Sequence, residues 1–449
     1  MKKIFILIAV LTVISCANKQ KTENREYIVL SGKIENQKAA KISIINNDFT
    51  KEISLNAEGI FTDTLRVDTG YYSLYHDRTN ATLFLTKGEE LKITTDATKF
   101  IDSMRFEGKD ATSNKFLVDK VLRNRGKDPV AIFSQEEGEF IKTMSDIRDV
   151  TSQKLKEATD LDEAFIAFEK KNIKYAHLIN LSRYPQYYPY YSKNENYKPS
   201  ETFMAYFKNI EYDNEEDFKI YENFRQLARQ HYSKKLNPFE DVKGSVATIK
   251  NLKSQVLKNT LAQELAFFIS PSGKDADYLY TALSEISTNE KFKKELTKKY
   301  TDIQKLKAGK DSPTFDYENH KGGTTSLADL QGKYVYIDVW ATWCGPCIAE
   351  IPSLKKVEKD YHNKNINFVS ISIDALKDHD KWKKMVTDKE LGGVQLMADK
   401  AWQSQFVTDY VIDGIPRFIL IDPNGKIVNA DAPRPSDKKL IELFDELKI

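Results

Sequence analysis

The sequence predicts a multidomain protein with an N-terminal all-β, sandwich-like domain (residues 27–108), a central α-helical domain (109–308) and a C-terminal α/β domain (309–449). Short alternating apolar runs separated by turn residues fill the first part, and apolar residues at helical spacing fill the second. The last part contains a β-branched apolar run, Tyr334–Val339, followed by a helical pattern. A length of 449 residues fits two or three domains.

The N-terminus has the pattern of a bacterial export signal. A basic start precedes an apolar core at 4–14, which is shorter than the roughly 20 residues that span a bilayer. The sequence Val-Ile-Ser-Cys ending at Cys16 resembles a lipobox. We therefore expect removal of residues 1–15, lipidation of Cys16, and a polar tether over 16–26. The alternative is an ordinary cleaved signal that leaves a spare cysteine.

Charge is balanced over the chain. Lys and Arg number 68, Asp and Glu number 66, and the formal net charge is +2. Proteins that bind nucleic acid carry a strongly basic surface, so we expect no nucleic-acid partner. The chain has 3 cysteines, and lipidation of Cys16 would leave the exported protein with only the pair at 344 and 347.

Residues 27–108 alternate short apolar runs with turns such as Ala57-Glu58-Gly59 and Lys87-Gly88-Glu89. β-Branched and aromatic residues in such runs are typical of a β-sandwich or barrel. The runs predicted as strands are Ile28–Leu30, Ile42–Ile45, Leu65–Val67, Tyr71–Tyr75, Thr82–Leu85 and Leu91–Ile93.

From about residue 110 the apolar residues change to helical spacing, most clearly over 161–179 and 218–227. Prolines are scarce there and are expected between helices. The aromatic stretch 184–191 contains Pro185 and Pro189, so we expect a proline-broken helix connection whose rings pack on the helical bundle. The alternative is an aromatic platform for a peptide or glycan.

The stretch Trp343-Cys344-Gly345-Pro346-Cys347 follows a predicted strand at Tyr334–Val339 and precedes a helical pattern. Two cysteines in this spacing at a strand-to-helix junction indicate a redox pair. Free N–H groups at the helix start would stabilise a thiolate on Cys344, leaving Cys347 as the shielded resolving thiol. The alternatives are a structural disulfide and half of a zinc site. Zinc needs two more ligands, and no second Cys pair or His pair has ligand spacing. We expect neither a metal nor a cofactor.

The sequence from Tyr334 to Cys347 resembles the active-site strand and helix of the thioredoxin superfamily. Its continuation Ile-Ala-Glu-Ile-Pro, ending at Pro352, resembles the TlpA/ResA branch of membrane-anchored thiol-disulfide oxidoreductases. So do Gly309-Lys-Asp-Ser-Pro-Thr-Phe315 and Ser326-Leu-Ala-Asp-Leu-Gln-Gly-Lys333. The resemblance covers residues 309–449 and implies a thioredoxin-like fold there. The β-rich part resembles, more distantly, the small domain ahead of such folds in lipoproteins of the Bacteroides group.

The resemblance also implies roles for two acids. Asp338 occupies the position of the buried acid of thioredoxin, where TlpA/ResA relatives often have an amide. Burial should raise its pKa and make it a proton acceptor for Cys347; the alternative is a structural carboxylate. Glu350 matches a glutamate that lies near the active site in the ResA branch. It would shuttle protons, or else belong to a solvated helix face.

Gly414-Ile415-Pro416 resembles the loop that carries the cis-proline of the fold. The Pro416 ring would lie against the disulfide, and the Ile415 backbone would bind an extended substrate. Trp343 is expected to shape this substrate site. Arg417 replaces the usual threonine and is expected to point to solvent, with recognition of acidic partners as the alternative.

The sequence therefore predicts a lipid-anchored, periplasm-facing protein of the cell envelope that reduces protein disulfides. The ResA resemblance suggests cytochrome c maturation and a membrane-embedded thiol electron donor. The alternatives are a disulfide isomerase, a binding lipoprotein with a secondary redox domain, and a thiol peroxidase of the AhpC/TSA type. The last type has a threonine three residues and a proline seven residues before its cysteine, where this chain has Ala341 and Ile337.

Overall fold

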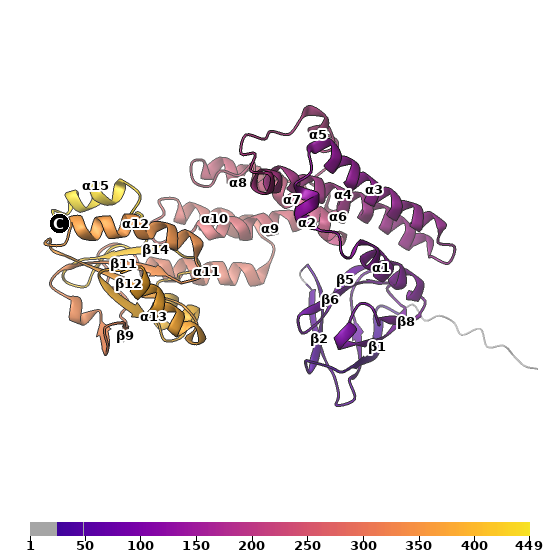
Figure 1. Ribbon diagram of the computed structural model, residues 1–449, viewed down its shortest axis with the longest axis horizontal. Helices are drawn as coiled ribbons and strands as arrows, with labels where there is room; N and C mark the ends of the chain where they lie inside the picture. Colours follow the sequence, from indigo (N-terminus) through magenta and orange to yellow (C-terminus); the bar gives the residue numbers. More distant parts are fainter. Residues whose placement is uncertain (1–24, 48) are drawn as a thin grey trace, which may run out of the picture. The chain divides into compact units, whose positions relative to one another are not determined.

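The computed structural model describes residues 25–47 and 49–449, and Cys16 with its predicted lipidation lies outside them. The chain forms two compact units (Figure 1). The first contains the described residues up to 212 together with 216–228, and the second contains 213–215 and 229–449. No helix in the described part is long and apolar enough to cross a membrane.

The N-terminal region consists of two four-stranded sheets, ordered β4-β1-β7-β8 and β3-β2-β5-β6. Apolar side chains from both sheets share one core, as expected for alternating strands that bury one face. The strands are β1 (Ile28–Glu35), β2 (Lys41–Asn46), β3 (Phe49–Ser54), β4 (Ile60–Leu65), β5 (Gly70–His76), β6 (Thr79–Leu85), β7 (Glu90–Asp96) and β8 (Arg105–Gly108). The all-β prediction is confirmed at this level. The pattern missed β3 and β8, and it placed the strand that ends at Leu65 too late.

Helices follow from Asp110 onward within the first unit. They are α1 (Ala111–Asn124), α2 (Pro129–Phe133), α3 (Glu137–Glu157), α4 (Glu163–Ser192), α5 (Glu201–Ala205), α6 (Glu215–Ile220) and α7 (Glu222–Ser233), the last two reaching into the second unit. A buried carboxylate links them to the β-rich region. Glu169 of α4 accepts hydrogen bonds from the Tyr71 hydroxyl at 2.6 Å and from the Lys120 ammonium at 2.5 Å.

The predicted break at residues 184–191 is wrong, because α4 continues through Pro185 and Pro189 to Ser192. Aromatic packing accompanies this continuity: Tyr184 stacks on Phe140 with ring centroids 4.2 Å apart and on Tyr188 at 4.9 Å. Both tyrosines are almost fully buried, as the packing interpretation expects. The stabilisation gained by burying these rings offsets the free-energy cost of the backbone hydrogen bonds that the two prolines remove.

The second unit begins with further helices: α8 (Val242–Lys250), α9 (Gln255–Leu265), the 3₁₀ turn η2 (Ala266–Phe268), α10 (Ala276–Ile286) and α11 (Glu290–Gln304). Side-chain caps start several of them. Ser254 accepts a hydrogen bond from the Leu257 N–H, and Asn289 accepts one from the Phe292 N–H, which satisfies donors that the helix itself leaves free.

The C-terminal part is the predicted α/β domain. Its seven-stranded sheet has the order β10-β9-β13-β12-β11-β14-β15, with β11 parallel to β12 and antiparallel to β14. The strands are β9 (Asp316–Asn319), β10 (Thr324–Ser326), β11 (Tyr334–Trp340), β12 (Ile366–Ser372), β13 (Val394–Met397), β14 (Arg417–Ile421) and β15 (Ile427–Asn429). The helices are α12 (Gly345–Asp360), α13 (His379–Asp388), α14 (Gln405–Asp409) and α15 (Lys439–Glu446).

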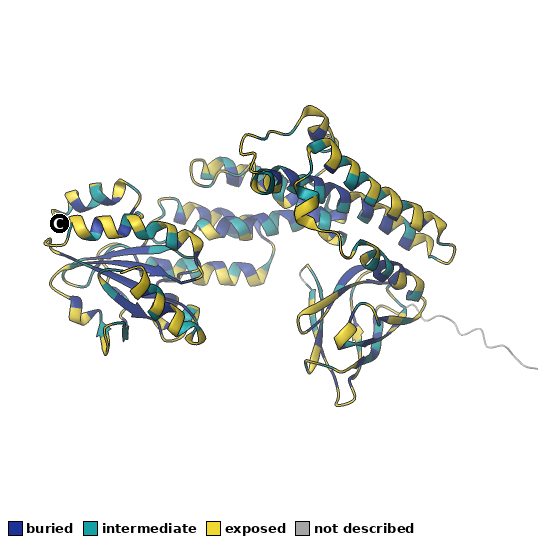
Figure 2. Ribbon diagram, in the orientation of Figure 1, coloured by how far each residue is buried: buried dark blue, intermediate teal, exposed yellow. Residues whose placement is uncertain are grey.

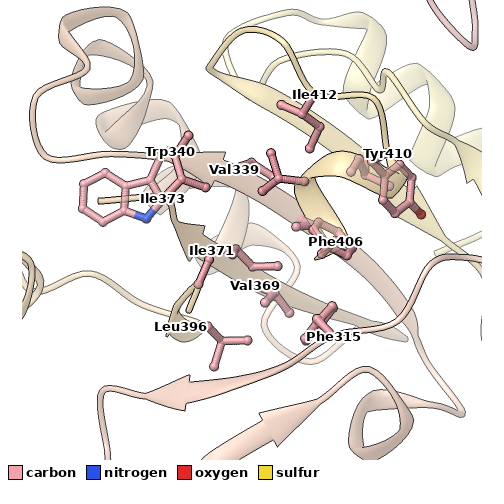
Figure 3. Packing of buried hydrophobic residues seen from close by; sticks show 14 of the residues in the cluster. Phe315, Val339, Trp340, Val369, Ile371, Ile373, Leu396, Phe406, Tyr410 and Ile412 are labelled. Atoms are coloured by element: carbon pink, nitrogen blue, oxygen red, sulfur yellow. The ribbon is translucent and has the colours of Figure 1, made fainter. Parts of the chain in front are cut away.

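Helices cover both faces of this sheet (Figure 1). Leu354 of α12 and Phe444 of α15 pack on one face, and Trp382 of α13 and Phe406 of α14 pack in the core of the other. The central strands are almost entirely buried, whereas the covering helices are exposed on their outer sides (Figure 2). Val339 of β11 and Ile371 of β12 lie at the centre of the core that contains Trp382 and Phe406 (Figure 3). A parallel pair buried on both faces explains the continuous apolar runs in the sequence.

Candidate active site

Cys344 and Cys347 form a disulfide where β11 ends and α12 begins, with their Cα atoms 5.3 Å apart. Cys344 is the N-cap of α12, and its sulfur accepts a hydrogen bond from the Cys347 N–H at 3.2 Å. After reduction, this N–H and the positive end of the helix dipole would stabilise a thiolate on Cys344 rather than on Cys347. The local geometry therefore favours a thiolate on Cys344 over one on Cys347.

Burial does not distinguish the two cysteines in this oxidised state. Cys344 is 4% exposed and Cys347 is 3% exposed, and both belong to the apolar core that contains Trp340. Trp343, by contrast, is 52% exposed. Its ring lies 6.4 Å from that of Trp402, measured between centroids. The disulfide is thus shielded within the domain, and an exposed indole lies directly beside it in the sequence.

A buried carboxylate that the sequence analysis missed holds the turn before the disulfide. Asp374 accepts hydrogen bonds from the Thr342 N–H at 2.9 Å, the Thr342 hydroxyl at 2.7 Å and the Ser372 hydroxyl at 2.7 Å. All three residues are buried. Because β11 and β12 are parallel neighbours, the segments after both strands meet at the same edge of the sheet. An acid two residues after the second strand was the signal that could have revealed this contact.

Asp338 lies on β11, where it pairs with Ser370 of β12 and Phe418 of β14. Its carboxyl is buried. Burial, reinforced by the negative charges of Glu358 and Glu350, raises its pKa from 3.8 to about 8, and a contact with Ser370 opposes this. The raised pKa agrees with the expectation from sequence. Near pH 7 a minority of Asp338 would be ionised and able to accept a proton.

Glu358 of α12 is a second acid with an altered pKa, and the sequence analysis did not single it out. Burial raises its pKa to about 7, although nearby Lys355 opposes the change. Its carboxylate occupies space beside Gly392 and Gly393, where a Cβ on Gly392 would come within 2.3 Å of Oε2. Because the two glycines have no side chains, the Glu358 carboxylate fits beside them, and its negative charge helps to raise the pKa of Asp338.

Glu350 is tied to the loop before α15. Its carboxylate accepts hydrogen bonds from the Ser436 N–H at 3.1 Å and hydroxyl at 2.8 Å, and Arg434 lies 3.9 Å away. The side chain is 12% exposed, so the solvated helix face considered for it is wrong. Its negative charge contributes to the raised pKa of Asp338.

The Ile415–Pro416 peptide bond is cis, as the sequence motif predicts, and Ile415 packs at the edge of the core that contains both cysteines. Arg417 differs from the expectation. It does not point to solvent, because its side chain is only 12% exposed and pairs with Asp431 at 3.1 Å. Its place at the start of β14, opposite Val339, sets it within the sheet.

No group of three or more His, Cys, Asp or Glu residues in the described part of the chain is arranged to hold a metal ion. The chemistry that the site offers on its own is dithiol–disulfide exchange. It combines a thiolate-stabilising helix start with a buried acid whose pKa of about 8 suits proton transfer near neutrality.

The C-terminal domain is similar to known proteins. Residues 308–430 match the AhpC/TSA family. A thiol-disulfide oxidoreductase ResA of Bacillus cereus is 30% identical over 129 residues, which are 29% of this chain and 72% of that protein. ResA of Bacillus subtilis is 28% identical over 127 residues, covering 28% and 67% of the two chains.

Among solved structures, the thioredoxin domain of a thiol-disulfide oxidoreductase from Bacteroides vulgatus is 30% identical. The match covers 32% of this chain and 98% of that one, with a TM-score of 0.29. The similarity to ResA of Bacillus cereus extends over most of that protein. Through its C-terminal domain, which holds the Cys344–Cys347 disulfide, the chain belongs to the ResA-like thiol-disulfide oxidoreductases of the AhpC/TSA family.

Proposed function

We propose that this protein reduces disulfides of other proteins from a lipid anchor on the periplasm-facing side of a membrane. The observation that carries the proposal is the Cys344–Cys347 disulfide at the start of α12, preceded on β11 by a buried acid with a pKa of about 8. The client class suggested by the ResA resemblance is apocytochrome c. A membrane-embedded thiol protein would return electrons to the oxidised pair.

The reaction takes place in two exchanges. The Cys344 thiolate attacks one sulfur of the client disulfide, forming a mixed disulfide and releasing one client thiol. Asp338 then accepts the proton of the Cys347 thiol. The Cys347 thiolate attacks the Cys344 sulfur, which breaks the mixed disulfide and releases the second client thiol. The client gains two electrons from the cysteine pair and two protons, one that Asp338 passes on from Cys347 and one from water, and Cys344–Cys347 is oxidised.

Trapping tests the proposal. Cys347→Ser should accumulate a mixed disulfide through Cys344 that mass spectrometry can identify, whereas Cys344→Ser should trap nothing. Reduced Cys344 should also react with iodoacetamide faster than Cys347, because the Cys347 N–H stabilises the Cys344 thiolate. Preferential labelling of Cys347 would reverse the assignment of the nucleophile.

The direction of the reaction is tested by the redox potential and by turnover of insulin. The Gly-Pro pair between the cysteines matches thioredoxin, so we expect a reducing potential nearer to about −270 mV than to the roughly −120 mV of DsbA. A potential close to the DsbA value would contradict a reductase. An isomerase needs only the attacking thiol, so isomerase activity surviving in Cys347→Ser would favour that alternative.

Anchoring has a separate test. Wild-type protein should partition into detergent after processing, and Cys16→Ser should remain aqueous because it lacks the acylated thiol. Aqueous behaviour of both would remove the anchor from the proposal and leave the chemistry unaffected.

A further inference from the structure

The loop before Pro416 is contacted by a side chain from the helical part of the second unit. Phe267 lies in η2, and its ring carbons approach within 3.5 and 3.7 Å of the position that a Cβ on Gly414 would occupy. These are ordinary van der Waals distances. The Phe267 side chain nevertheless remains 57% exposed. An aromatic ring thus lies beside the cis-proline loop and presents most of its surface to solvent.

One ammonium group holds this arrangement together. Lys299 of α11 donates to the Asp413 carboxylate at 2.8 Å and to the Ala266 carbonyl at 3.2 Å, and its Nζ lies 5.9 Å from the centre of the Phe267 ring. The Lys299 side chain is only 19% exposed. A single partly buried cation therefore joins α11, η2 and the loop, which keeps Phe267 beside Gly414.

The loop itself offers backbone groups to a ligand. Within the part of the chain that the structure describes, the N–H and C=O of Ile415 make no hydrogen bond, and β14 begins only at Arg417. Free backbone groups next to a strand are a template for adding an extended segment. A segment paired with Gly414 and Ile415 would place a neighbouring side chain within reach of the Phe267 ring.

We propose that Phe267 is a specificity-determining residue for client proteins, and that it selects extended polypeptides with a large apolar side chain beside the disulfide cysteine. This inference rests on the proposed function, because it names the substrate class of the same site. Aromatic residues are common among those that dominate binding energy, and a large apolar side chain packed on the Phe267 ring would remove the exposed face of that ring from water. The helical part of the second unit thereby contributes to substrate choice as well as to the fold.

The test uses the full chain and three substrates: insulin, the small disulfide dithionitrobenzoate, and a pair of disulfide-bonded peptides that differ only in Leu or Ser beside one cysteine. Phe267→Ala should raise KM for insulin about 5- to 10-fold with kcat unchanged, the loss expected for one aromatic anchor. It should also abolish the preference of the wild type for the Leu peptide. Dithionitrobenzoate turnover and redox potential should not change.

Phe239→Ala is the matched control. Phe239 is a more exposed phenylalanine of the same unit, at 84%, and its ring contacts Phe268 with centroids 5.0 Å apart. Its removal should leave KM for insulin unaltered, and Phe267→Leu should restore most of the affinity. An unchanged KM in Phe267→Ala, or an equal effect on dithionitrobenzoate or on the potential, would overturn the inference. A wild type inactive on insulin would instead contradict the proposed function itself.

Discussion

At the scale of single residues, the site contains two acids, Asp338 and Glu358, whose surroundings raise their pKa. Asp338 retains its proton to about pH 8 because it is buried and because Glu358 and Glu350 add negative charge nearby. Such a carboxyl costs stability whenever it ionises in the folded protein. Its burial is therefore easier to explain by a task in proton transfer than by a contribution to folding.

Asp338→Asn should make the C-terminal domain more stable at neutral pH. The folded pKa of Asp338, about 8, lies above its unfolded value, so the folded protein binds the extra proton. The contribution of Asp338 to stability is then greatest below about pH 4 and falls as pH rises toward 8, by an amount on the order of 5 kcal/mol. The amide should remove this decline. The decline is measured by unfolding oxidised wild type and Asp338→Asn in urea at pH 5 and pH 8, with tryptophan fluorescence as the probe. All 4 tryptophans lie in residues 309–449.

The same variant should slow insulin reduction, most clearly near neutral pH, because Cys347 loses its proton acceptor. An unchanged rate would make Asp338 structural. An equally steep loss of stability with pH in both proteins would show that Asp338 does not hold a proton in the folded state.

Glu358→Gln should lower the pKa of Asp338. Removing this negative charge favours the ionised form of Asp338, so the acidic limb of the pH–rate profile for insulin reduction should move to lower pH. The effect should be largest above about pH 7, where Glu358 itself is charged. Asp360→Asn is the control, because Asp360 lies at the end of the same helix in an exposed pair with Lys356. Equal movement of the profile in both variants would contradict a specific effect of Glu358.

At the scale of elements, the start of α12 is positioned by the segment that follows β12. Asp374 accepts hydrogen bonds from the buried N–H and hydroxyl of Thr342, a residue of the turn that leads to Cys344. Contacts of this kind fix the direction in which a helix starts. The N-cap geometry of Cys344 therefore depends on a side chain from the neighbouring strand's end.

Asp374→Ala should destabilise the C-terminal domain by about 1–3 kcal/mol, because it leaves the buried Thr342 N–H without a partner. It should also slow the reaction of reduced Cys344 with dithionitrobenzoate. Thr342→Val removes only the hydroxyl contact and should cost less in both measurements. Equal losses in the two variants would mean that the backbone N–H bond is not what positions the turn.

At the scale of the whole molecule, the chain divides into two compact units, and the redox pair lies in the second. The first unit joins its sheets to its helices through Glu169, which is fully buried and bound to Tyr71, Lys120 and Asn172. Breaking a buried ion pair is costly because the remaining partner stays without its countercharge. Loss of the Glu169 ion pair should therefore lower the stability of the first unit and leave the stability of the redox domain unaltered.

Glu169→Leu should lower the stability of the first unit by an amount on the order of 3 kcal/mol. Circular dichroism should show an earlier transition in urea, whereas tryptophan fluorescence, which reports only on the second unit, should not move. Glu157→Gln, which removes an exposed pair with Lys154, should leave both probes unchanged. A joint movement of both probes would show that the two units unfold together.

Local patterns in the sequence determined the types of the three regions and the redox pair, and the resemblance to thioredoxin indicated the buried acid at 338 and the cis-proline loop. Each of these rests on residues close together in the chain: a period of two or 3.6, a cap, or a short motif. The same local reasoning failed at α4, where prolines 185 and 189 predicted a break. It also missed β3, whose mixed composition has no clear apolar alternation.

Tertiary structure alone decided the contacts that complete the site. Thr342 meets Asp374, Arg417 turns inward to Asp431, and the Phe267 ring meets Gly414, a residue far along the chain. No short pattern encodes such pairs, because their geometry follows from how strands pair and helices pack on the sheet. Five consecutive residues, 343–347, are therefore enough to predict the chemistry of the disulfide. The groups that tune it and choose its substrates come from segments that only the packed fold brings together.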